Sequence, residues 1–439
     1  MRVRNPLHVP CSQSLGLNMR ASIFLSSASL LFITGLLSAA QGQVEPISSP
    51  AVPQRNLSQH PLVTDSGLEW TLSLVQIYQQ NVHGGLSTHR RAGRVSGSYD
   101  LDLTGDLEKL FGFEALGFYA LAEGGYSEGI SSRSAGSFFG VNDTARGDRS
   151  MDISELWLQW VLADETVHFR VGKLDLTAGF ECRNCPSAFD GSSYANNENA
   201  QFLNSALVNN PAIPFPAYGL GAAFFYNPAD HDYWYISTAV VDAQADERET
   251  GVRTTFHDED YLFFILETGI APQLNSPRGP MQGAYRFGLW YDPQDKERFS
   301  SGTIRRDDTG IYLSCDQLVY KEQGDPEDTQ GLGVFVRYGW ASSKVNELTN
   351  FFSVGFQYQG LIEARDHDVM AIGFAHGSFS DAASAVLPQD YESVMEFYYS
   401  AQVRPGMDIA PSVQYITNPA GEGKISDALV FGLRMLLSF

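Results

Sequence analysis

The last twelve residues of the chain, 428–439, alternate between two kinds of side chain with a period of two. One set is entirely apolar and comprises Leu429, Phe431, Leu433, Met435, Leu437 and Phe439. The other set is thinner and partly polar, with Val430, Gly432, Arg434 and Ser438. A period of two predicts a strand with one face toward an apolar medium and the other toward a more polar, hydrated environment. Because an exposed apolar edge strand invites aggregation, the pattern favours the closing strand of a membrane barrel over a buried strand of a soluble β-protein.

The composition of the chain is compatible with such a barrel. The 439 residues include 41 glycines and 12% aromatic residues, and only 18% of them are charged. The mean hydropathy of -0.17 excludes a bundle of apolar membrane helices. It does not exclude a membrane barrel, since only alternate residues of such strands face lipid.

The chain is strongly acidic, with a formal net charge of -22. Nucleic-acid binding requires a basic surface, so we exclude nucleic acid as a partner. Acidic surface loops that keep the protein soluble account for the charge in the simplest way. A preference against anionic solutes is the functional alternative.

The N-terminal region has the features of an export signal. Residues 21–40 form an apolar stretch behind Arg20, and small residues with a cleavage-site pattern follow it up to Gly42. We therefore expect a signal peptide at 1–42, within which 1–18 is either a mis-assigned extension or a long charged segment. An uncleaved anchor helix is the alternative. Residues 43–65 are expected to form an extended periplasmic lead, and 66–439 a single β-barrel domain.

Five further stretches sort into two faces in the same way as the C-terminus. They are 152–162, 167–174, 333–341, 351–360 and 392–404. Soluble antiparallel sheets also alternate, but here the polar face holds isolated charges and amides with few lysines or threonines. A membrane strand needs about 9–11 residues, so roughly 375 residues would hold on the order of 16 strands. The predicted fold class is all-β, a transmembrane antiparallel barrel of about 16 strands, wide enough for an aqueous channel.

The four cysteines give little indication of a metal site. Only Cys182 and Cys185 lie close together, as an isolated Cys-x-x-Cys, and we expect them to form a disulfide in a loop. A zinc site would need a second such pair or a pair of histidines, and neither is present. Cys315 lies in an apolar alternating stretch and is expected to be an inert strand residue. We expect no metal and no cofactor.

The sequence carries no convincing catalytic motif. Nucleophile-elbow, metalloprotease, phosphate-loop and dinucleotide-binding patterns are all missing. A lipase on the outer wall of a barrel would need converging serine and histidine, for which His376-Gly377-Ser378 is the nearest match, and a chance match explains it better. The chain is therefore not expected to be an enzyme.

Four regions, in this order along the chain, carry a resemblance to a known family. Residues 97–113 contain Thr-Gly-Asp before a turn, then Gly-Phe. Residues 153–159 contain Glu-Leu-Trp, and 171–175 contain Gly-Lys-x-Asp. Residues 202–221 contain Phe-Leu-Asn and a proline-rich stretch. Residues 408–419 contain Pro-x-x-Gln-Tyr-Ile. Together they resemble the carbohydrate-selective porins of the OprB type over about residues 95–439.

Two departures from the family pattern indicate a divergent member. The chain has the Cys-x-x-Cys insertion, and it has Gly-Asp-Leu-Glu-Lys at 105–109 where the family has a Gly-Asp-Trp-Gly-Gly type of turn. Selectivity for glucose is therefore not assumed.

The resemblance implies an outer-membrane porin of a Gram-negative-type bacterium, through which small neutral solutes, sugars above all, diffuse passively. The family constriction is lined by charged and polar side chains, whose opposed charges order water and penalise apolar solutes. From the faces assigned above, the candidate pore-lining residues are Glu155, Trp157, Gln159, Arg170, Arg337, Gln357, Glu396, Tyr398, Arg404 and Arg434. Trp157 and Tyr398 are candidates for stacking on a sugar ring. In the alternative view, the charged pairs merely neutralise one another inside the barrel.

The resemblance also implies partners. These are small sugars as solutes, outer-membrane lipids, and the barrel assembly machinery acting through the C-terminal Phe439; a monomer and a homotrimer both stay open. Lys173 and Asp175 match the family motif, but the alternation places them on the lipid face unless a bulge at Gly172 switches it. Two other functions remain as alternatives: a general or anion-selective porin, and a secreted soluble β-protein that binds or hydrolyses carbohydrate.

Overall fold

The computed structural model describes residues 67–89, 92–163, 166–177, 189–228, 234–245, 261–324, 328–383 and 388–439. All of them lie in the unit that spans Ser49–Phe439. The expected signal peptide, the expected periplasmic lead and the expected disulfide of Cys182 with Cys185 lie outside the described residues.

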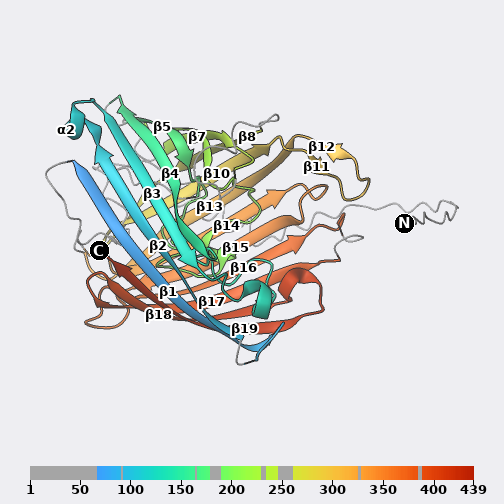
Figure 1. Ribbon diagram of the computed structural model, residues 1–439. Helices are drawn as coiled ribbons and strands as arrows, with labels where there is room; N and C mark the ends of the chain where they lie inside the picture. The colour runs from blue at the N-terminus through green and yellow to red at the C-terminus, as the bar shows by residue number, and fades with distance from the viewer. Residues whose placement is uncertain are drawn as a thin grey trace. The chain divides into compact units, whose positions relative to one another are not determined.

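Long antiparallel strands make up the wall, and sixteen of them form a closed ring (Figure 1). In chain order these are β1 (Leu68–Gly85), β2 (Gly93–Asp106), β3 (Leu116–Tyr126), β4 (Arg149–Leu162), β5 (Val167–Leu174), β6 (Gly219–Tyr226), β7 (Trp234–Asp242), β8 (Leu262–Ile270), β10 (Gly279–Asp292), β13 (Asp308–Lys321), β14 (Gly331–Ala341), β15 (Leu348–Gln359), β16 (Val369–Phe379), β17 (Tyr391–Arg404), β18 (Met407–Thr417) and β19 (Ser426–Ser438). The ring closes where β1 pairs with β19, from Ser73 opposite Ser438 to Gly85 opposite Ser426. The predicted barrel is confirmed.

The remaining elements are short. They are the strands β9 (Gln273–Ser276), β11 (Lys296–Glu297) and β12 (Ile304–Arg305), and the helical turns α2 (Leu107–Phe111), η2 (Ser131–Ala135), α3 (Ser205–Val208) and η4 (Pro419–Gly421). None of these helices is long and apolar enough to cross a membrane.

The two faces of each strand differ as the alternation predicts. In β4, the Leu156 side chain is 53% exposed on the outer surface, whereas Glu155 is 4% exposed on the inner side. In β19, Phe431 and Leu433 are exposed and Arg434 is buried. Apolar side chains therefore face outward along the wall, because lipid offers no hydrogen bonds, and polar side chains face the lumen.

The two ends of the barrel differ in the length of their connections. At one end the strands are joined by short connections, such as 360–368 between β15 and β16 and Pro405-Gly406 between β17 and β18. The C-terminal residue lies at this end, where the Phe439 amide donates to the Leu72 carbonyl at 2.9 Å. Outer-membrane barrels have short periplasmic turns and longer extracellular loops. The long connections 127–148 and 175–218 therefore start at the extracellular end.

The turn between β2 and β3 explains one departure from the family pattern. Asp106 caps α2, because its Oδ1 accepts hydrogen bonds from the backbone amides of Glu108 and Lys109 at 3.0 and 3.1 Å. The helix ends at Gly112, whose φ of 76° is the left-handed conformation that glycine adopts at least cost. Gly-Asp-Leu-Glu-Lys thus forms a capped helical turn.

Candidate functional site

Two of the long extracellular connections fold into the barrel. The longer one, residues 189–218, is held by carboxylates on separate strands. Glu396 of β17 accepts hydrogen bonds from the Leu203 and Asn204 amides at 2.9 and 2.8 Å. Asp316 of β13 accepts from Ser192 Oγ at 2.6 Å. Because both carboxylates lie on the inner side of the wall, the segment lies inside the lumen and narrows it.

The second inserted segment, residues 127–148, is fixed in the same way. Glu392 of β17 accepts hydrogen bonds from Ser137 Oγ at 2.6 Å and from the Phe138 and Phe139 amides at 2.8 and 3.1 Å. The two segments also bind each other, since the Asp143 amide donates to the Leu203 carbonyl at 2.8 Å. They form one constriction rather than two independent loops.

Apolar packing supports the constriction from beneath. Phe202 is fully buried and meets the rings of Tyr398 and Phe335 edge-on, with centroid distances of 5.1 and 5.8 Å. Leu207 and Val208 of α3 belong to the same cluster of buried side chains. The inserted segment is therefore packed against one side of the wall like the core of a soluble domain.

Arginines of the wall hold the inserted segment rather than face the open passage. Arg337 of β14 is fully buried and donates to the Leu207 and Val208 carbonyls at 2.9 and 2.8 Å. Its Nη2 also donates to Asn196 Oδ1 at 2.8 Å. Arg434 of β19 donates to the Glu198 carbonyl at 3.1 Å. Both arginines satisfy backbone groups that would otherwise be buried without partners.

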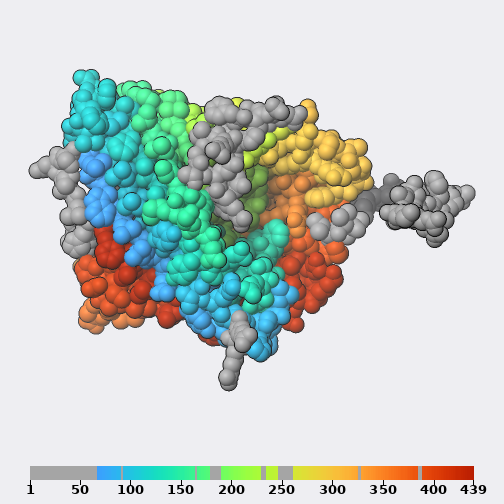
Figure 2. All heavy atoms as spheres, viewed as in Figure 1, coloured from blue at the N-terminus to red at the C-terminus, as the bar shows by residue number. Residues whose placement is uncertain are grey.

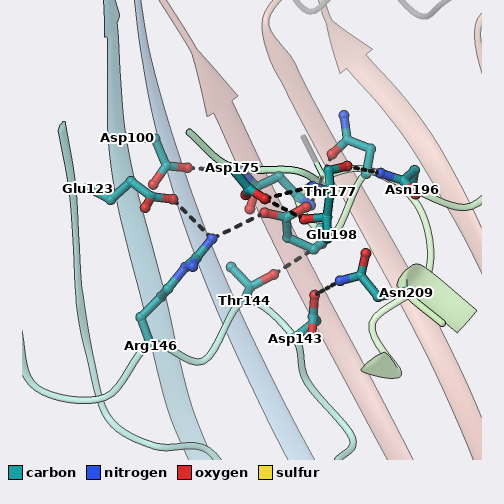
Figure 3. Close-up of polar contacts among 12 residues, drawn as sticks. Asp100, Glu123, Asp143, Thr144, Arg146, Asp175, Thr177, Asn196, Glu198 and Asn209 are labelled. Carbon is teal, nitrogen blue, oxygen red and sulfur yellow. Dashed lines mark hydrogen bonds and ion pairs between the residues drawn. The ribbon is translucent and has the colours of Figure 1, made fainter. Parts of the chain in front are cut away.

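A cluster of charged side chains lies where the two segments meet the strands β2, β3 and β5 (Figure 3). We call it the Arg146 cluster, and its members are Asp100, Glu123, Asp143, Arg146, Asp175 and Glu198. The Arg146 guanidinium bridges Glu123 at 2.9 Å and Glu198 at 3.3 Å. Its side chain is 18% exposed and that of Glu198 is 26% exposed. Both groups are therefore partly accessible to solvent.

Two carboxylates of this cluster that lie outside the strands, Glu198 and Asp175, have raised pKa values. Burial raises the pKa of Glu198 to about 7, although the Arg146 guanidinium opposes the shift. Burial also raises the pKa of Asp175, while hydrogen bonds from Thr177 oppose it. The charge of the Arg146 cluster is therefore sensitive to pH near neutrality.

Nine of the ten candidate pore-lining residues lie on the inner side of the wall. Eight of them are buried: Glu155, Trp157, Gln159, Arg170, Arg337, Glu396, Tyr398 and Arg434. Gln357 is partly buried, and its Oε1 accepts from Tyr398 Oη at 3.2 Å and Gln201 Nε2 at 3.3 Å. Arg404 lies instead at the exposed turn between β17 and β18, because the pairing shifts register between Gln402 and Arg404.

The two aromatic candidates have no room for a sugar ring. Trp157 lies between Tyr119, at a centroid distance of 5.1 Å, and the Arg170 guanidinium, at 4.6 Å. Tyr398 is 1% exposed beneath Phe202. Both rings contribute to packing, and stacking on a sugar is not supported at either.

The motif pair Lys173 and Asp175 follows a distorted strand end. Gly172 has a φ of 145°, and a side chain there would collide with the Leu156 carbonyl, 2.2 Å from an added Cβ. Lys173 is buried and its Nζ donates to the Ile153 carbonyl at 3.0 Å. Asp175 lies just beyond the strand in the Arg146 cluster, where its amide donates to Glu155 Oε2 at 3.1 Å.

Sequence reasoning missed the residues that line the constriction. Asp100 and Glu123 could have been found, since they share the inward phase of their strands. Arg146, Asp143 and Glu198 lie in irregular segments, where no period indicates direction. In the described part of the chain, no group of three or more His, Cys, Asp or Glu side chains is arranged to hold a metal ion.

The architecture defines the class of protein before any comparison. A closed sixteen-stranded barrel with an apolar outer wall, and with segments that narrow its lumen, is an outer-membrane porin. The space-filling view shows a hollow bordered by the green and orange parts of the chain (Figure 2). The barrel is thus a channel of the Gram-negative outer membrane and not an enzyme.

Comparison with known proteins places the chain within this class. Residues 90–439 match the family described as "Carbohydrate-selective porin, OprB family", and the chain belongs to it. It is 21% identical to Porin B of Pseudomonas aeruginosa over 412 residues, covering 85% of this chain and 88% of that protein. It is also 21% identical to the putative porin QuiX of Acinetobacter baylyi, covering 65% of this chain and 69% of that protein.

A solved structure shows the same fold. The high-pH structure of Pseudomonas putida OprB superposes with a TM-score of 0.71 at 20% sequence identity, covering 85% of this chain and 95% of that chain. The predicted family and the predicted location in the outer membrane are confirmed.

Proposed function

We propose that the barrel allows small neutral solutes, sugars in particular, to diffuse passively through a water-filled lumen with a charged constriction. The observation that carries the proposal is the inward folding of 127–148 and 189–218, which brings Arg146 and Glu198 to the passage, partly exposed. The description of the family as carbohydrate-selective supports the choice of solute.

The physical basis is the exchange of hydrogen bonds. A sugar hydroxyl both donates and accepts, so it can replace part of its hydration by bonds to a guanidinium and a carboxylate. An apolar solute of the same size displaces water from these groups without forming hydrogen bonds to them. A charged constriction therefore favours hydroxyl-rich solutes.

The test is the conductance of the purified full-length protein in a planar bilayer, with glucose, maltose and longer oligosaccharides added in turn. Discrete channels whose current is blocked by sugar would support the proposal and rank the solutes. Channels that ignore every sugar would contradict the selectivity and indicate a general pore. Absence of channels would contradict passive diffusion itself.

We further propose that the barrel assembly machinery binds the C-terminal strand at Phe439, and that outer-membrane lipids surround the apolar wall. The exposed Phe431, Leu433 and Phe439 side chains of this region support both proposals. Chemical cross-linking in the intact envelope would distinguish a monomer from a homotrimer.

A further inference from the structure

We infer that the constriction selects by charge, that it favours cations, and that among sugars it prefers protonated amino sugars over acid sugars. This inference rests on the proposed function and names the solute class for the same passage. The Arg146 cluster is the element that discriminates, and Glu198 is its specificity-determining residue.

The first observation is the charge balance at the passage. The Arg146 cluster holds five carboxylates and one guanidinium (Figure 3). The wall arginines Arg337 and Arg434 do not redress this balance, because they are 0% and 2% exposed and bind the inserted segment. The charges that a solute meets are therefore predominantly negative.

The second observation is a carboxylate oxygen that needs a donor. Asp100 is 7% exposed, and its Oδ2 accepts from Asn199 Nδ2 at 2.9 Å. Its Oδ1 is buried and has no hydrogen-bond partner among the described residues. The side chain points into the Arg146 cluster (Figure 3). A buried acceptor without a donor is costly, and an ammonium group that passes the cluster compensates its negative potential without touching it.

Carboxylates in a narrow pore act more strongly than on an open surface. Protein walls exclude water and focus the field, so counter-ions of one sign are concentrated. The Debye length is about 10 Å at 0.1 M salt and about 30 Å at 0.01 M. We therefore expect the preference for cations to rise as the salt concentration falls.

An amino sugar combines both properties that the passage recognises. Its hydroxyls exchange hydrogen bonds in the way proposed for neutral sugars, and its ammonium group compensates the excess of carboxylates. An acid sugar carries the same hydroxyls with the opposite charge, so it is repelled. The three probes glucosamine, N-acetylglucosamine and glucuronate share a hexose ring and differ in charge.

The experiment measures the reversal potential of the full-length protein in a planar bilayer under a tenfold KCl gradient. We expect a potential of the sign that denotes cation selectivity, with a permeability ratio of K⁺ to Cl⁻ of about 3 or more, as repulsion focused by the pore predicts. Under the same conditions, we expect glucosamine to block the current at lower concentration than N-acetylglucosamine, and glucuronate to be weakest.

Three variants, one of them a control, test the assignment. Glu198→Gln keeps the shape of the side chain and removes its charge, so the permeability ratio should fall at least twofold. Glu363→Gln removes an exposed carboxylate from the short turn between β15 and β16, and should leave the ratio unchanged. Arg146→Gln removes the cation of the cluster and should raise the ratio.

The pH dependence provides an independent readout. Glu198 faces Arg146 and Asp143 of the inserted segment 127–148 and Glu123 of β3. Because its pKa is about 7, the carboxylate is charged above this pH and neutral below it. The cation preference should therefore be stronger at pH 8 than at pH 6, and Glu198→Gln should flatten this difference.

The possible failures are distinguishable. Channels that are blocked by neutral sugars but show no charge preference, or an anion preference, would overturn the inference and leave the proposed function intact. Channels that ignore all three sugars while showing cation selectivity would overturn the amino-sugar assignment and the proposed sugar passage together. Absence of channels would refute the proposed diffusion.

Discussion

At the scale of single residues, Arg337 shows how a charge on the inner wall can be structural. Its guanidinium donates to the two carbonyls at the end of α3, and its Nε lies 3.7 Å from a carboxylate oxygen of Asp190. Removal of one partner from a buried ion pair leaves the other charge without compensation. The side chain therefore fixes the inserted segment, and a sugar in the passage does not reach it.

We predict that Arg337→Ala lowers the free energy of unfolding by about 3–5 kcal/mol, the usual cost of breaking a buried ion pair. Burial already raises the pKa of Asp190 to about 7, with Arg337 opposing the rise. Without Arg337 the pKa should rise further. Because a protonated Asp190 carries no charge, the loss should be smaller at pH 5 than at pH 8.

Urea unfolding followed by tryptophan fluorescence in detergent micelles measures this loss. Arg306→Ala is the matched control, since the Arg306 side chain is 65% exposed in an extracellular loop. Equal losses for the two variants would show that Arg337 does not hold the segment.

Residue-level prediction from the sequence depends on the strand period. Glu155 and Gln159 were predicted to face inward because they alternate with the apolar Leu156 and Leu158, and all four follow the register shift between Ile153 and Glu155. Arg170 was predicted to face inward because it lies between Phe169 and Val171. Arg404 is exposed at the end of β17, where the pairing shifts register after Gln402. No count of alternating residues can carry a prediction across a bulge.

At the scale of elements, the inserted segment 189–218 and the wall are stabilised by different interactions. The wall depends on its ladder of backbone hydrogen bonds, whereas the segment depends on side-chain packing and on carboxylates such as Glu396. Phe202 of the segment is fully buried against the Tyr398 and Phe335 rings of the wall. Loss of this contact should loosen the constriction without opening the barrel.

We predict that Phe202→Ala increases single-channel conductance and current noise. The cavity left by the missing ring should destabilise the packing of the segment on the wall by about 3–5 kcal/mol. A segment without regular secondary structure should not stay fixed after such a loss. The barrel itself should stay folded in detergent at room temperature and keep the gel mobility of the folded form. Phe352→Ala is the control, because Phe352 faces outward on β15 and is 40% exposed. Unchanged conductance in Phe202→Ala would show that the segment is held by its hydrogen bonds alone.

The inserted segments could not be predicted from the sequence for a physical reason. Residues 189–218 contain no sustained period, since they alternate between contacts with the wall, with the other segment and with the passage. The resemblance at Phe202-Leu203-Asn204 marked the region without showing its direction. The Arg146 cluster depends on three such irregular positions, so its assembly required the fold.

At the scale of the whole molecule, closure of the ring depends on the last strand. The Phe439 amide and carbonyl both pair with Leu72, at 2.9 and 3.2 Å, and complete the seam between β1 and β19. The alternation of residues 428–439 predicted this strand, and no other part of the fold follows so directly from its sequence.

We predict that removal of Phe439 reduces the amount of assembled barrel in the outer membrane several-fold. The variant loses the two backbone hydrogen bonds to Leu72 and the proposed signal for assembly. Heat-modifiable mobility of the envelope fraction on a gel gives the measurement. Phe439→Tyr keeps the ring and both backbone bonds and should assemble normally. Assembly of the truncated protein at the level of the unaltered chain would refute the prediction.

The two inserted segments have a topological consequence for the order of assembly. Each leaves and re-enters the wall between adjacent strands at the extracellular end, 127–148 between β3 and β4 and 175–218 between β5 and β6. The C-terminus lies at the opposite end. Each segment is joined in sequence to wall strands on both sides, so within the described residues neither requires a chain end to be threaded through the ring. The wall can therefore close first around an empty lumen, and the segments can enter afterwards from outside, so that the pore is narrowed only once its wall exists.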